Sequence, residues 1–426
     1  MKLFMQNSFI TDSSLECQKG CYFVKTSSNA KFSEHARANG ASVISPAQAY
    51  EMAKIPENLQ IIGITGTNGK TTTATLLSYI LNFLGFKCAN CGTRGAFIKD
   101  EQILEKSLTT NQFLTTLSLI KKSADMDCSH FVMEVSSHAI AQNRIEALPF
   151  ALKIFTNLSQ DHLDYHKTFE EYALVKSSFF SDHSLKLINS DDPFIKFNKT
   201  NAHFYGLSEQ EFSIDEHFIK ADGKKLEFCS HLYGKFNLYN ILCAFSAANL
   251  LLPNRHNDII KAISEFPGVS GRTELVAKKP LVIVDFAHTP DGVEKVLSAL
   301  LTRKIIAVMG AGGDRDASKR PIMGAIASKY ASTLIITSDN PRSENPEKII
   351  AQIKEGSDEA LKNGEKCEVF CEVDRKKAIK MALDMANDEI IAILGKGDED
   401  YQEINGVKHH FSDKEVVQEF LNINTK

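Results

Sequence analysis

The stretch of sequence that decides the fold is Ile61-Ile62-Gly63-Ile64-Thr65-Gly66-Thr67-Asn68-Gly69-Lys70-Thr71-Thr72. Its apolar run, its glycines and its Lys-Thr pair predict a buried strand, a phosphate-binding loop and the start of a helix. Gly66 and Gly69 allow the backbone N–H groups to point inward at an anion. Lys70 can then reach the outer phosphates, and the Thr71 hydroxyl can ligate Mg²⁺. We therefore expect ATP or a close relative as the ligand.

The residues around this loop support the interpretation, although the loop is not the commonest form of the motif. In G-x-x-x-x-G-K-[ST] the first glycine stands where this chain has Ile64, so Gly66 acts from inside the loop. The helix predicted behind the loop has an apolar face and a glycine stop, formed by Leu76, Leu77, Ile80, Leu81, Leu84 and Gly85. An ordinary glycine-rich turn is the alternative, and it is disfavoured because Lys-Thr at a helix start after a buried strand has little other use.

Length and composition indicate a protein of several domains that acts on small molecules. The chain has 426 residues, and domains of roughly 100–200 residues predict two or three of them. A net charge of −4 gives no basic field for nucleic acid. Residues 1–7 lack the apolar core of a secretory signal, and the apolar stretch 76–86 is too short to span a bilayer. We expect a monomer that stays in the cytoplasm and inserts in no membrane.

The nine cysteines include three close pairs, Cys17/Cys21, Cys88/Cys91 and Cys367/Cys371. A zinc site needs four ligands, which usually lie on turns. The run 88–91 instead indicates a strand after a helix, in which residues three apart point to opposite faces. We expect buried thiols rather than a metal or redox site.

Residues 1–56 predict a small α/β domain, in which the apolar runs 21–24 and 41–44 flank a helical stretch at 33–39. Asp12-Ser13 falls in a turn, where Ser13 either caps a local element or contacts a ligand. Pro56-Glu57-Asn58 is the first plausible linker.

Residues 57–269 predict a central domain whose strands end in polar residues. The apolar runs 130–133, 153–155 and 187–189 lead into Glu134, into Asp161-His162 and into Asp191-Asp192. Ligands of parallel sheets bind beyond the carboxyl ends of the strands, so we expect these three ends to converge on the nucleotide. Glu134 is then placed to hold a metal whose other oxygen ligands come from phosphates.

One lysine of this domain lies on an apolar helix face. The helix is predicted to begin with the capping box Thr168-x-x-Glu171, and its stripe comprises Phe169, Tyr172, Ala173, Phe179 and Phe180. Lys176 falls on that stripe. Apolar neighbours would lower its pKa and free the amine for chemistry, whereas a lysine at the edge of the stripe would extend its amine to water.

Residues 270–426 predict a third domain that repeats the pattern of a buried strand and a functional loop. Four apolar runs, which we expect to form four consecutive strands, end at the loops 285–291, 310–316, 338–342 and 395–399. Arginines and carboxylates recur in these loops, which favours a zwitterionic ligand. The glycines of residues 310–313 match no full dinucleotide fingerprint.

From Gly63 to about Tyr401 the chain resembles the ATP-dependent Mur ligases of peptidoglycan synthesis. The motifs that carry the resemblance are Thr65-Gly66-Thr67-Asn68-Gly69-Lys70-Thr71, Glu134-Val135-Ser136-Ser137-His138, Asp161-His162-Leu163-Asp164-Tyr165-His166, Gly313-Asp314-Arg315-Asp316 and Asp339-Asn340-Pro341-Arg342. The resemblance implies an α/β fold of three domains. These are a small N-terminal α/β domain for the UDP-sugar peptide, a central P-loop-type ATPase domain with a mostly parallel sheet, and a C-terminal Rossmann-like domain for the incoming amino acid.

The resemblance also assigns roles to residues. ATP-binding positions are Gly66, Thr67, Asn68, Gly69, Lys70, Thr71, Thr72, Asn237, Asn240, Arg272 and Asp285. Mg²⁺ would be held by Thr71, Glu134, His162 and a Lys176 carbamylated by CO₂, and the catalytic set is Lys70, Lys176, Glu134 and His162. The UDP-sugar peptide would contact Ser13, Thr109, Thr110, Ser136, Gln142 and Arg144. The amino-acid pocket comprises Arg315, Asp339, Asn340, Pro341, Arg342, Gly395 and Glu399.

The reaction that the resemblance implies joins meso-diaminopimelate to the D-Glu γ-carboxylate of UDP-N-acetylmuramoyl-L-alanyl-D-glutamate. ATP would activate this carboxylate as an acyl phosphate, which the amine of the diamino acid then displaces. Arg342 would receive the distal carboxylate of diaminopimelate, and Glu399 the distal amine. Lysine would leave the guanidinium unpaired, at a cost of roughly 2–5 kcal/mol.

Two residues depart from the family pattern, the first domain is short, and two alternatives remain at this point. Leu108 stands where the family often has Asn, Asp398 replaces a usual His, and the short first domain leaves the uridine contacts open. Within the enzyme class, a folylpolyglutamate synthetase-like ligase shares the loop, but Asp339–Arg342 and Thr109-Thr110 argue against it. A nucleotide-dependent switch or binding module would need no amino-acid pocket.

Overall fold

The computed structural model describes residues 1–106, 108–208, 210–232 and 234–423. These residues form two compact units, one of residues 1–230 and 238–266, the other of residues 231–237 and 267–426. Each unit is described by itself. The finer division at 56/57 and 269/270 stays a prediction.

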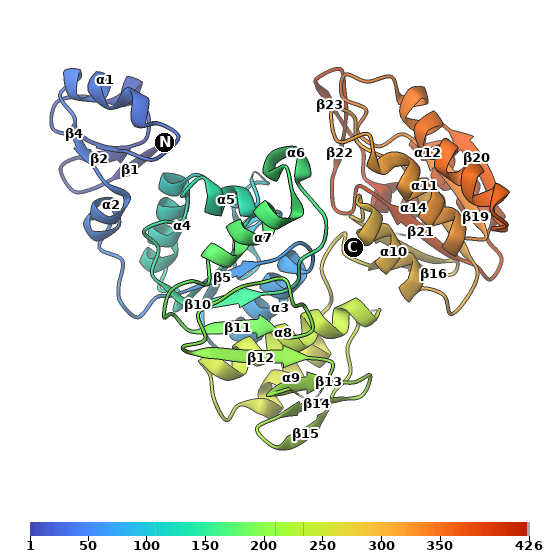
Figure 1. Ribbon diagram of the computed structural model, residues 1–426, viewed down its shortest axis with the longest axis horizontal. Helices are drawn as coiled ribbons and strands as arrows, with labels where there is room; N and C mark the ends of the chain where they lie inside the picture. Colours follow the sequence, from blue (N-terminus) through green and yellow to red (C-terminus); the bar gives the residue numbers. More distant parts are fainter. Residues whose placement is uncertain (107, 209, 233, 424–426) are drawn as a thin grey trace. The chain divides into compact units, whose positions relative to one another are not determined.

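The first unit begins with a four-stranded sheet in the order β1-β2-β3-β4, in which only the pair β1/β2 is antiparallel (Figure 1). Its elements are β1 (Lys2–Phe4), β2 (Phe9–Thr11), η1 (Ser14–Glu16), β3 (Tyr22–Val24), η2 (Ala30–Phe32), α1 (Ser33–Ala38), β4 (Ser42–Ile44) and α2 (Pro46–Met52). The small α/β architecture predicted for residues 1–56 is therefore present. Ser13 is the N-cap residue of η1, but its side chain makes no capping hydrogen bond.

The main sheet of this unit has eleven strands among the described residues, in the order β15-β14-β13-β12-β11-β10-β5-β9-β6-β7-β8. The strands are β5 (Gln60–Thr65), β6 (Cys88–Gly92), β7 (Gly95–Ile98), β8 (Glu101–Leu104), β9 (His130–Glu134), β10 (Phe150–Phe155), β11 (Lys186–Asn189), β12 (Ala202–Gly206), β13 (Phe212–Ile214), β14 (Phe218–Ala221) and β15 (Lys224–Glu227). From β13 to β6 all neighbours are parallel, and the hairpins at both edges are antiparallel. The predicted mostly parallel sheet is confirmed.

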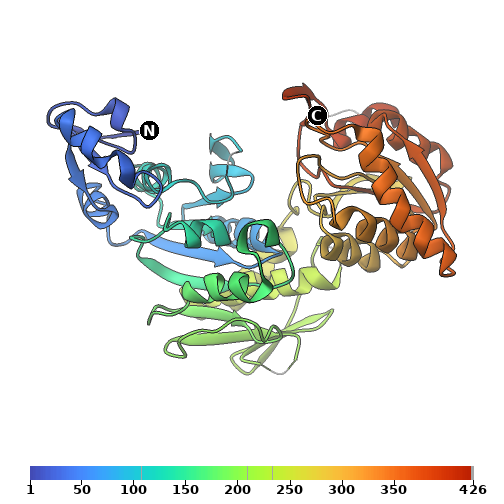
Figure 2. The ribbon, with the colours of Figure 1, turned by 45° about the horizontal axis from the view of Figure 1, so that its top comes forward.

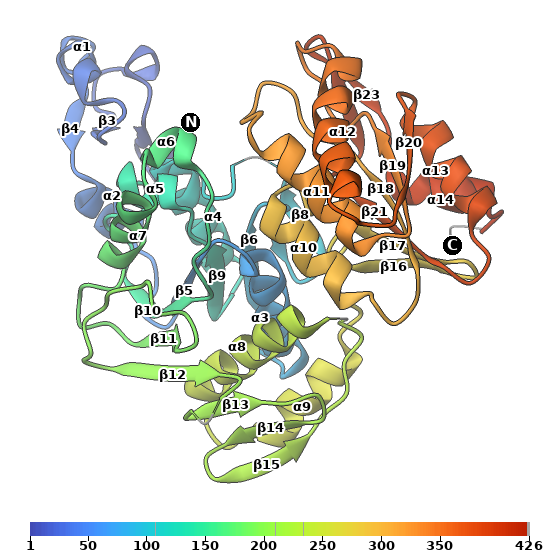
Figure 3. The same cartoon turned by 45° about the vertical axis from the view of Figure 1, so that its right-hand side comes forward.

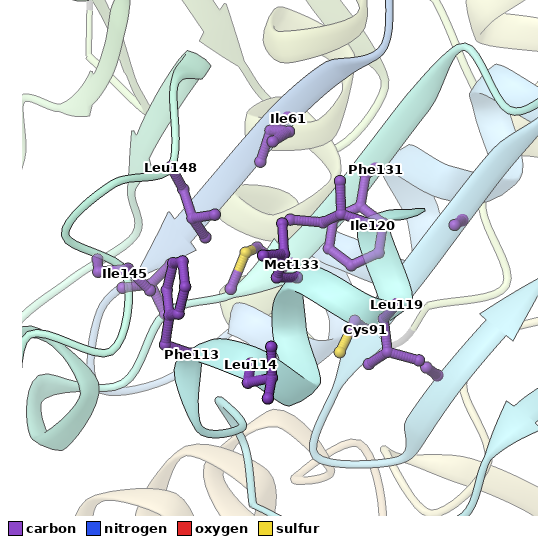
Figure 4. Packing of buried hydrophobic residues seen from close by; sticks show 14 of the residues in the cluster. Ile61, Cys91, Phe113, Leu114, Leu119, Ile120, Phe131, Met133, Ile145 and Leu148 are labelled. Atoms are coloured by element: carbon purple, nitrogen blue, oxygen red, sulfur yellow. The ribbon is translucent and has the colours of Figure 1, made fainter. Parts of the chain in front are cut away.

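Apart from α1 and α2, the helices of the first unit pack on both faces of this sheet (Figures 1 and 2). They are α3 (Lys70–Phe83), α4 (Phe113–Asp125), α5 (Ser137–Ala141), α6 (Leu163–His166), α7 (Phe169–Ser178), α8 (Lys235–Leu251), whose first turn belongs to the second unit, and α9 (His256–Glu265). Phe113 and Leu114 of α4 pack with Phe131 and Met133 of β9 in one buried cluster (Figure 4). Because side chains alternate along a strand, Val132 faces the other side, where α3 packs against β5, β6 and β9.

The strand β5 lies between β10 and β9, with β11 next to β10. The three polar strand ends predicted from the sequence therefore follow β11, β10 and β9 of one parallel run, in which β5 separates β10 from β9. However, the carboxylates after β11 brace loops: Asp192 accepts a hydrogen bond from Leu158 N at 2.5 Å, and Asp191 accepts one from Leu207 N at 2.7 Å.

The second unit is a doubly wound α/β sheet in the order β16-β17-β21-β18-β19-β20, in which only β16/β17 is antiparallel. Its elements are β16 (Glu274–Lys278), β17 (Leu281–Asp285), α10 (Pro290–Ala299), β18 (Ile305–Met309), α11 (Lys319–Tyr330), β19 (Thr333–Thr337), α12 (Pro346–Lys362), β20 (Glu368–Glu372), α13 (Arg375–Met385), β21 (Ile390–Leu394), β22 (Tyr401–Ile404), β23 (Val407–His410) and α14 (Asp413–Phe420). Figure 3 shows α10, α11 and α12 on one face of the sheet and α13 and α14 on the other.

The four strands predicted to carry functional loops are neighbours in this sheet, because β17, β21, β18 and β19 adjoin in that order. The prediction that they follow one another in the chain was wrong, since β20 lies between β19 and β21. Its run Glu368-Val369-Phe370-Cys371-Glu372 is bounded by charges and is half-exposed at the sheet edge, so it lacks the continuous apolar signal of the inner strands.

The cysteines are free thiols, and the prediction that they are buried holds for Cys21, Cys88, Cys91, Cys128 and Cys243 but not for Cys229 and Cys371, which are exposed. Cys88 and Cys91 lie in β6, and burial raises the pKa of each to about 12. Within the described part of the chain, no group of three His, Cys, Asp or Glu side chains is placed to hold a metal, and no helix is long and apolar enough to cross a membrane.

Candidate active site

The loop between β5 and α3 requires glycine at two positions. A Cβ at Gly66, which has φ 152°, would lie 1.9 Å from Thr156 Oγ1. A Cβ at Gly69, which has φ 86°, would lie 2.4 Å from Asn240 Oδ1. The close approach of Thr156 and of Asn240 on α8 therefore explains the two glycines of the motif.

The loop is held in place by the segment that follows β10. Asn157 accepts from Thr67 N through its carbonyl at 2.8 Å and from Asn68 N through its side chain at 3.0 Å. Thr156 Oγ1 donates to the Asn68 carbonyl at 2.7 Å, and Ser159 N donates to Thr67 Oγ1 at 3.0 Å. Hydrogen bonds to residues 156–159 therefore hold the loop in this conformation.

Lys70 opens α3 directly behind Gly69. Its Nζ donates to the carbonyls of Gly66 and Thr67, both at 2.9 Å, so the ammonium folds over the loop that would hold the phosphates. Thr71 and Thr72 follow as buried residues of the first helical turn. The positive charge and the helix N-terminus lie together, which suits a polyphosphate.

Glu134, at the end of β9, is a buried carboxylate with several donors. Its Oε2 accepts from Thr71 Oγ1 at 3.1 Å and from Thr93 Oγ1 at 3.1 Å, and its Oε1 accepts from Thr93 N at 2.9 Å. A Cβ at Gly92 would lie 2.1 Å from Oε1, so the residue before Thr93 has to be glycine for the carboxylate to lie here.

The positions predicted for the UDP-sugar peptide gather near this carboxylate. Thr110 Oγ1 donates to the Glu134 carbonyl at 2.9 Å and accepts from Ser136 N at 2.8 Å. Arg144 donates to the Thr110 carbonyl at 2.8 Å and through Nε to Gln142 Oε1 at 3.0 Å. Thr109 Oγ1 lies 3.2 Å from Thr93 Oγ1. Ser13 belongs to the separate N-terminal sheet region.

Lys176 is almost completely buried, with 1% of its surface exposed. Its Nζ donates to Gly66 O at 2.9 Å and to Thr65 Oγ1 at 3.2 Å, so the amine faces the phosphate loop and not solvent. Burial, with Lys70 as a second cause, holds the pKa of Lys176 well below its ordinary value. The alternative of a lysine that extends its amine to water is wrong.

His162 has φ 55° and belongs to a group of rings with His138, Tyr165, His166 and Tyr172. Its Nε2 lies 3.3 Å from Asp161 Oδ2. Loss of hydration lowers the pKa of His162, against the effect of Asp161. The lowered pKa favours the neutral imidazole, which is the form that can ligate a metal.

The donors near the loop fit magnesium. Mg²⁺ usually takes one or two protein oxygens and completes its shell with phosphates and water. Thr71 and Glu134 supply a hydroxyl and a carboxylate 3.1 Å apart beside the phosphate loop. Of the four predicted ligands, the described contacts bring these two together, whereas the amine of Lys176 bonds to the loop and His162 to Asp161.

The other residues predicted to bind ATP belong to both units. Asn240 lies beside Gly69 in the first unit, and Asn237 is buried in the first turn of α8. In the second unit the Arg272 guanidinium lies 4.5 Å from the centre of the Phe286 ring. The Asp285 carboxylate is buried, and burial raises its pKa while Arg272 opposes the change.

The loops after β19 and β21 meet at one edge of the second unit. Asn340 Nδ2 donates to Glu399 Oε2 at 2.8 Å, and a Cβ at Gly395 would lie 2.4 Å from Asp339 Oδ2. The fully buried Lys396 donates to Glu399 Oε2 at 3.2 Å and to Asn340 Oδ1 at 3.3 Å. The edge therefore holds carboxylates, amides and a buried cation in fixed positions.

The two arginines of this edge differ in their surroundings. Arg342, with φ 52°, donates through Nη1 to Gly313 O at 2.8 Å and lies 3.4 Å through Nε from Glu403 Oε2. Arg315 is exposed, and within the described chain its guanidinium makes no hydrogen bond or ion pair. Both side chains border Gly312.

Three contributors to these sites were not predicted from the sequence: Thr93, Lys396 and Glu403. Thr93 follows a strand with no charged residue at its end. Lys396 lies between two glycines of a loop that was predicted to be functional. Glu403 lies in the hairpin β22–β23, whose sequence gave no functional signal.

Asp398, which was noted as a departure from the family pattern, packs its backbone against Gly271. A Cβ at Gly271 would lie 2.0 Å from Asp398 N. Leu108, the other departure, is exposed.

Comparisons with known proteins agree with this arrangement. Residues 64–248 match the family described as Mur ligase middle domain, and residues 271–397 match Mur ligase, glutamate ligase domain. A protein of Helicobacter hepaticus named UDP-N-acetylmuramoyl-L-alanyl-D-glutamate--2,6-diaminopimelate ligase is 46% identical over 421 residues, which cover 94% of this chain and 89% of the relative. A protein of Helicobacter pylori with the same name is 44% identical and covers 97% of this chain and 95% of the relative.

Solved structures show the same fold. A structure of a UDP-N-acetylmuramoyl-L-alanyl-D-glutamate--2,6-diaminopimelate ligase matches with a TM-score of 0.69 and 30% identity, over 97% of this chain and 94% of that one. A Mycobacterium tuberculosis folylpolyglutamate synthase complexed with ADP matches with a TM-score of 0.66 but 15% identity, over 82% of this chain and 90% of that one. The second likeness concerns the fold alone.

Proposed function

The chain belongs to the Mur ligase family, and we propose that it is the ATP-dependent ligase that joins 2,6-diaminopimelate to UDP-N-acetylmuramoyl-L-alanyl-D-glutamate in peptidoglycan precursor synthesis. The observation that carries the proposal is that relatives at 44–46% identity, matched along nearly the whole chain, bear the name of this activity. The ordered phosphate loop and the charged edge of the second unit are what such a reaction needs.

An amide does not form from a carboxylate at neutral pH without activation, because oxide is a very poor leaving group. In the proposed reaction the D-Glu γ-carboxylate attacks the γ-phosphorus of ATP, and ADP leaves. The amine of diaminopimelate then attacks the resulting acyl phosphate, loses a proton, and phosphate departs. Lys70 contributes by placing positive charge where two anions have to meet, and most of the catalysis is positioning and charge neutralisation.

Thr71, Glu134, His162 and a carbamylated Lys176 would hold Mg²⁺, which supplies further neutralisation of the phosphate oxygens when bound. Two features of Lys176 support the modification. Its burial favours the neutral amine, and its Nζ lies 2.9 Å from the carbonyl of Gly66 in the phosphate loop. The neutral amine attacks CO₂ and loses one proton, which leaves a carbamate anion and turns a cation into an oxygen ligand.

We propose that the substrate diaminopimelate binds at the edge formed by Arg315, Asp339, Asn340, Arg342, Gly395 and Glu399, in its meso form. Glu399 accepts from Asn340 and Lys396 through Oε2, so its carboxylate is oriented for an ammonium of the ligand. Arg342 would receive the distal carboxylate. Binding of the UDP-sugar peptide near Thr109, Thr110, Ser136, Gln142 and Arg144, and the monomeric state, stay predictions.

Phosphate release tests the function directly. The protein is incubated with ATP, UDP-N-acetylmuramoyl-L-alanyl-D-glutamate and one amino acid from a panel of meso-diaminopimelate, its LL isomer, L-lysine and L-glutamate, and the product mass is measured. We expect release only with all three substrates, and most strongly with meso-diaminopimelate. Release with a folate acceptor and glutamate would favour a folylpolyglutamate synthetase-like ligase, and release without any amino acid would favour a nucleotide switch.

A further inference from the structure

The hairpin β22–β23 lies along the turn that carries Arg342. Arg342 N donates to Glu403 O at 3.0 Å, and Asn405 N donates back to Arg342 O at 2.8 Å. Glu403 N donates to Asn340 Oδ1 at 2.9 Å. The backbone of Glu403 is therefore fixed against the turn from both sides, and its side chain lies beside the guanidinium.

The side chains of Arg342 and Glu403 form an ion pair. Arg342 Nε and Glu403 Oε2 are 3.4 Å apart, with 21% and 26% of the two side chains exposed. Because Nη1 donates to Gly313 O at 2.8 Å, the guanidinium is held at two points. Arg342 thus has an internal carboxylate partner before any ligand arrives.

The buried Lys396 of the same edge also has carboxylate partners within the second unit. Its Nζ lies 4.0 Å from Asp339 Oδ1 and 3.2 Å from Glu399 Oε2. A ligand carboxylate at Arg342 therefore meets a guanidinium whose charge Glu403 already offsets. The two carboxylates compete for the same donors, since an arginine fork binds one carboxylate in its best geometry.

This inference rests on the proposed diaminopimelate ligase function. We propose that Glu403 is a specificity-determining residue, whose carboxylate competes with the distal carboxylate of diaminopimelate for Arg342. The competition weakens the binding of diaminopimelate and reduces the preference of the enzyme for diaminopimelate over lysine. Lysine ends in an ammonium, which the carboxylate of Glu403 attracts. Arg342 repels this ammonium less, because its guanidinium is paired with Glu403.

Replacement of one carboxylate oxygen of Glu403 by an amide nitrogen tests the inference. Glu403→Gln keeps the shape of the side chain and both backbone hydrogen bonds but removes the charge, so the turn should keep its structure. We expect the KM for diaminopimelate to fall about threefold to tenfold, the range of a half-buried ion pair, with kcat unchanged. The KM for lysine should stay the same or rise, so the preference for diaminopimelate increases.

Glu415→Gln is the matched control. Glu415 pairs with His410 of the same hairpin and not with Arg342. Glu415→Gln therefore makes the same change of charge and leaves the pair of Arg342 with Glu403 intact. Its two KM values should stay at wild-type levels. An unchanged or raised KM for diaminopimelate in Glu403→Gln, with an active wild type, would overturn this inference alone. Failure of the wild type to use diaminopimelate would overturn the proposed function as well.

Discussion

Thr93 donates two hydrogen bonds to the carboxylate of Glu134, one from its backbone N–H at 2.9 Å and one from its hydroxyl at 3.1 Å. The hydroxyl also lies 3.2 Å from Thr109 Oγ1, a position predicted to contact the UDP-sugar peptide. A single residue therefore orients the proposed metal carboxylate and borders the proposed acceptor site.

We expect Thr93→Val to raise the Mg²⁺ concentration needed for half-maximal activity about tenfold, because groups that orient metal ligands commonly contribute this much. Valine keeps the size and the backbone donor but not the hydroxyl. The measurement is a Mg²⁺ titration of phosphate release at saturating substrates. Thr93→Ser, which keeps the hydroxyl, should titrate like the wild type. Equal shifts in both variants would assign the effect to packing.

Lys176→Ala should be nearly inactive and should recover part of its activity when formate or acetate is added. The expected reason is that a small carboxylate can replace the carbamate oxygens in the space that the side chain leaves. Activity is measured against carboxylate concentration, with chloride at equal ionic strength as the control. Full activity of Lys176→Arg would rule out the carbamate, since arginine does not react with CO₂.

Phosphorylation should precede amine capture. With isotopically labelled ATP, positional isotope exchange should then require UDP-N-acetylmuramoyl-L-alanyl-D-glutamate but not diaminopimelate. The exchange is followed by phosphorus NMR. Exchange that appears only when the diamino acid is present would contradict this order.

Arg320 and Glu344 make an acid-sensitive contact in the second unit. The Arg320 side chain is 1% exposed, and it donates to Glu344 at 2.8 and 2.9 Å. These hydrogen bonds are the main cause that lowers the pKa of Glu344 from 4.5 to about 2. Because the folded-state pKa is depressed, the stabilisation is complete above pH 4.5 and is lost as the pH falls toward 2.

Glu344→Gln should therefore lower the thermal midpoint most at pH 7, at a cost of about 3 kcal/mol for leaving a buried guanidinium without its carboxylate. The difference from the wild type should shrink as the pH falls from about 4.5 toward 2, because the unfolded wild-type carboxyl binds a proton below 4.5 while the folded carboxyl, with a pKa of about 2, keeps its charge. Thermal unfolding is followed by circular dichroism from pH 7 to pH 3. A difference that is constant with pH would show that packing, not charge, holds the contact.

The inner strands and the phosphate loop were predictable because each depends on residues adjacent in sequence. An apolar run such as 61–65, followed by glycines and Lys-Thr, specifies a strand, a loop and a helix start by local geometry. The edge strand β20 and the hairpins carry mixed polar and apolar residues, so their pairing partners decide their structure.

Partners across the site were not predictable for a different reason. Thr93 and Glu134 are 41 positions apart, and their contact depends on the register between β6 and β9. The burial of Lys176 followed from its helix face, but its bond to Gly66 O depends on where α7 packs. Likewise, Arg342 was predicted to lie at the ligand edge, while its pairing with Glu403 is set by the hairpin.

The role of Arg342 itself gives the sharpest test of the amino-acid site. Arg342→Ala removes the cation proposed to receive the distal carboxylate and leaves Glu403 without its partner beside the ligand. Diaminopimelate then loses an attraction and meets a repulsion, whereas lysine gains an attraction for its ammonium. We expect the preference for diaminopimelate over lysine to fall by about two to three orders of magnitude, which corresponds to roughly 2–5 kcal/mol.

Competitive kinetics with both amino acids measure this preference as the ratio of their kcat/KM values. Arg342→Lys should give an intermediate ratio, because an ammonium keeps the charge but not the planar pair of donors. An unchanged ratio in Arg342→Ala would mean that the distal carboxylate binds elsewhere. Arg315, whose side chain is exposed, would then be the next residue to replace.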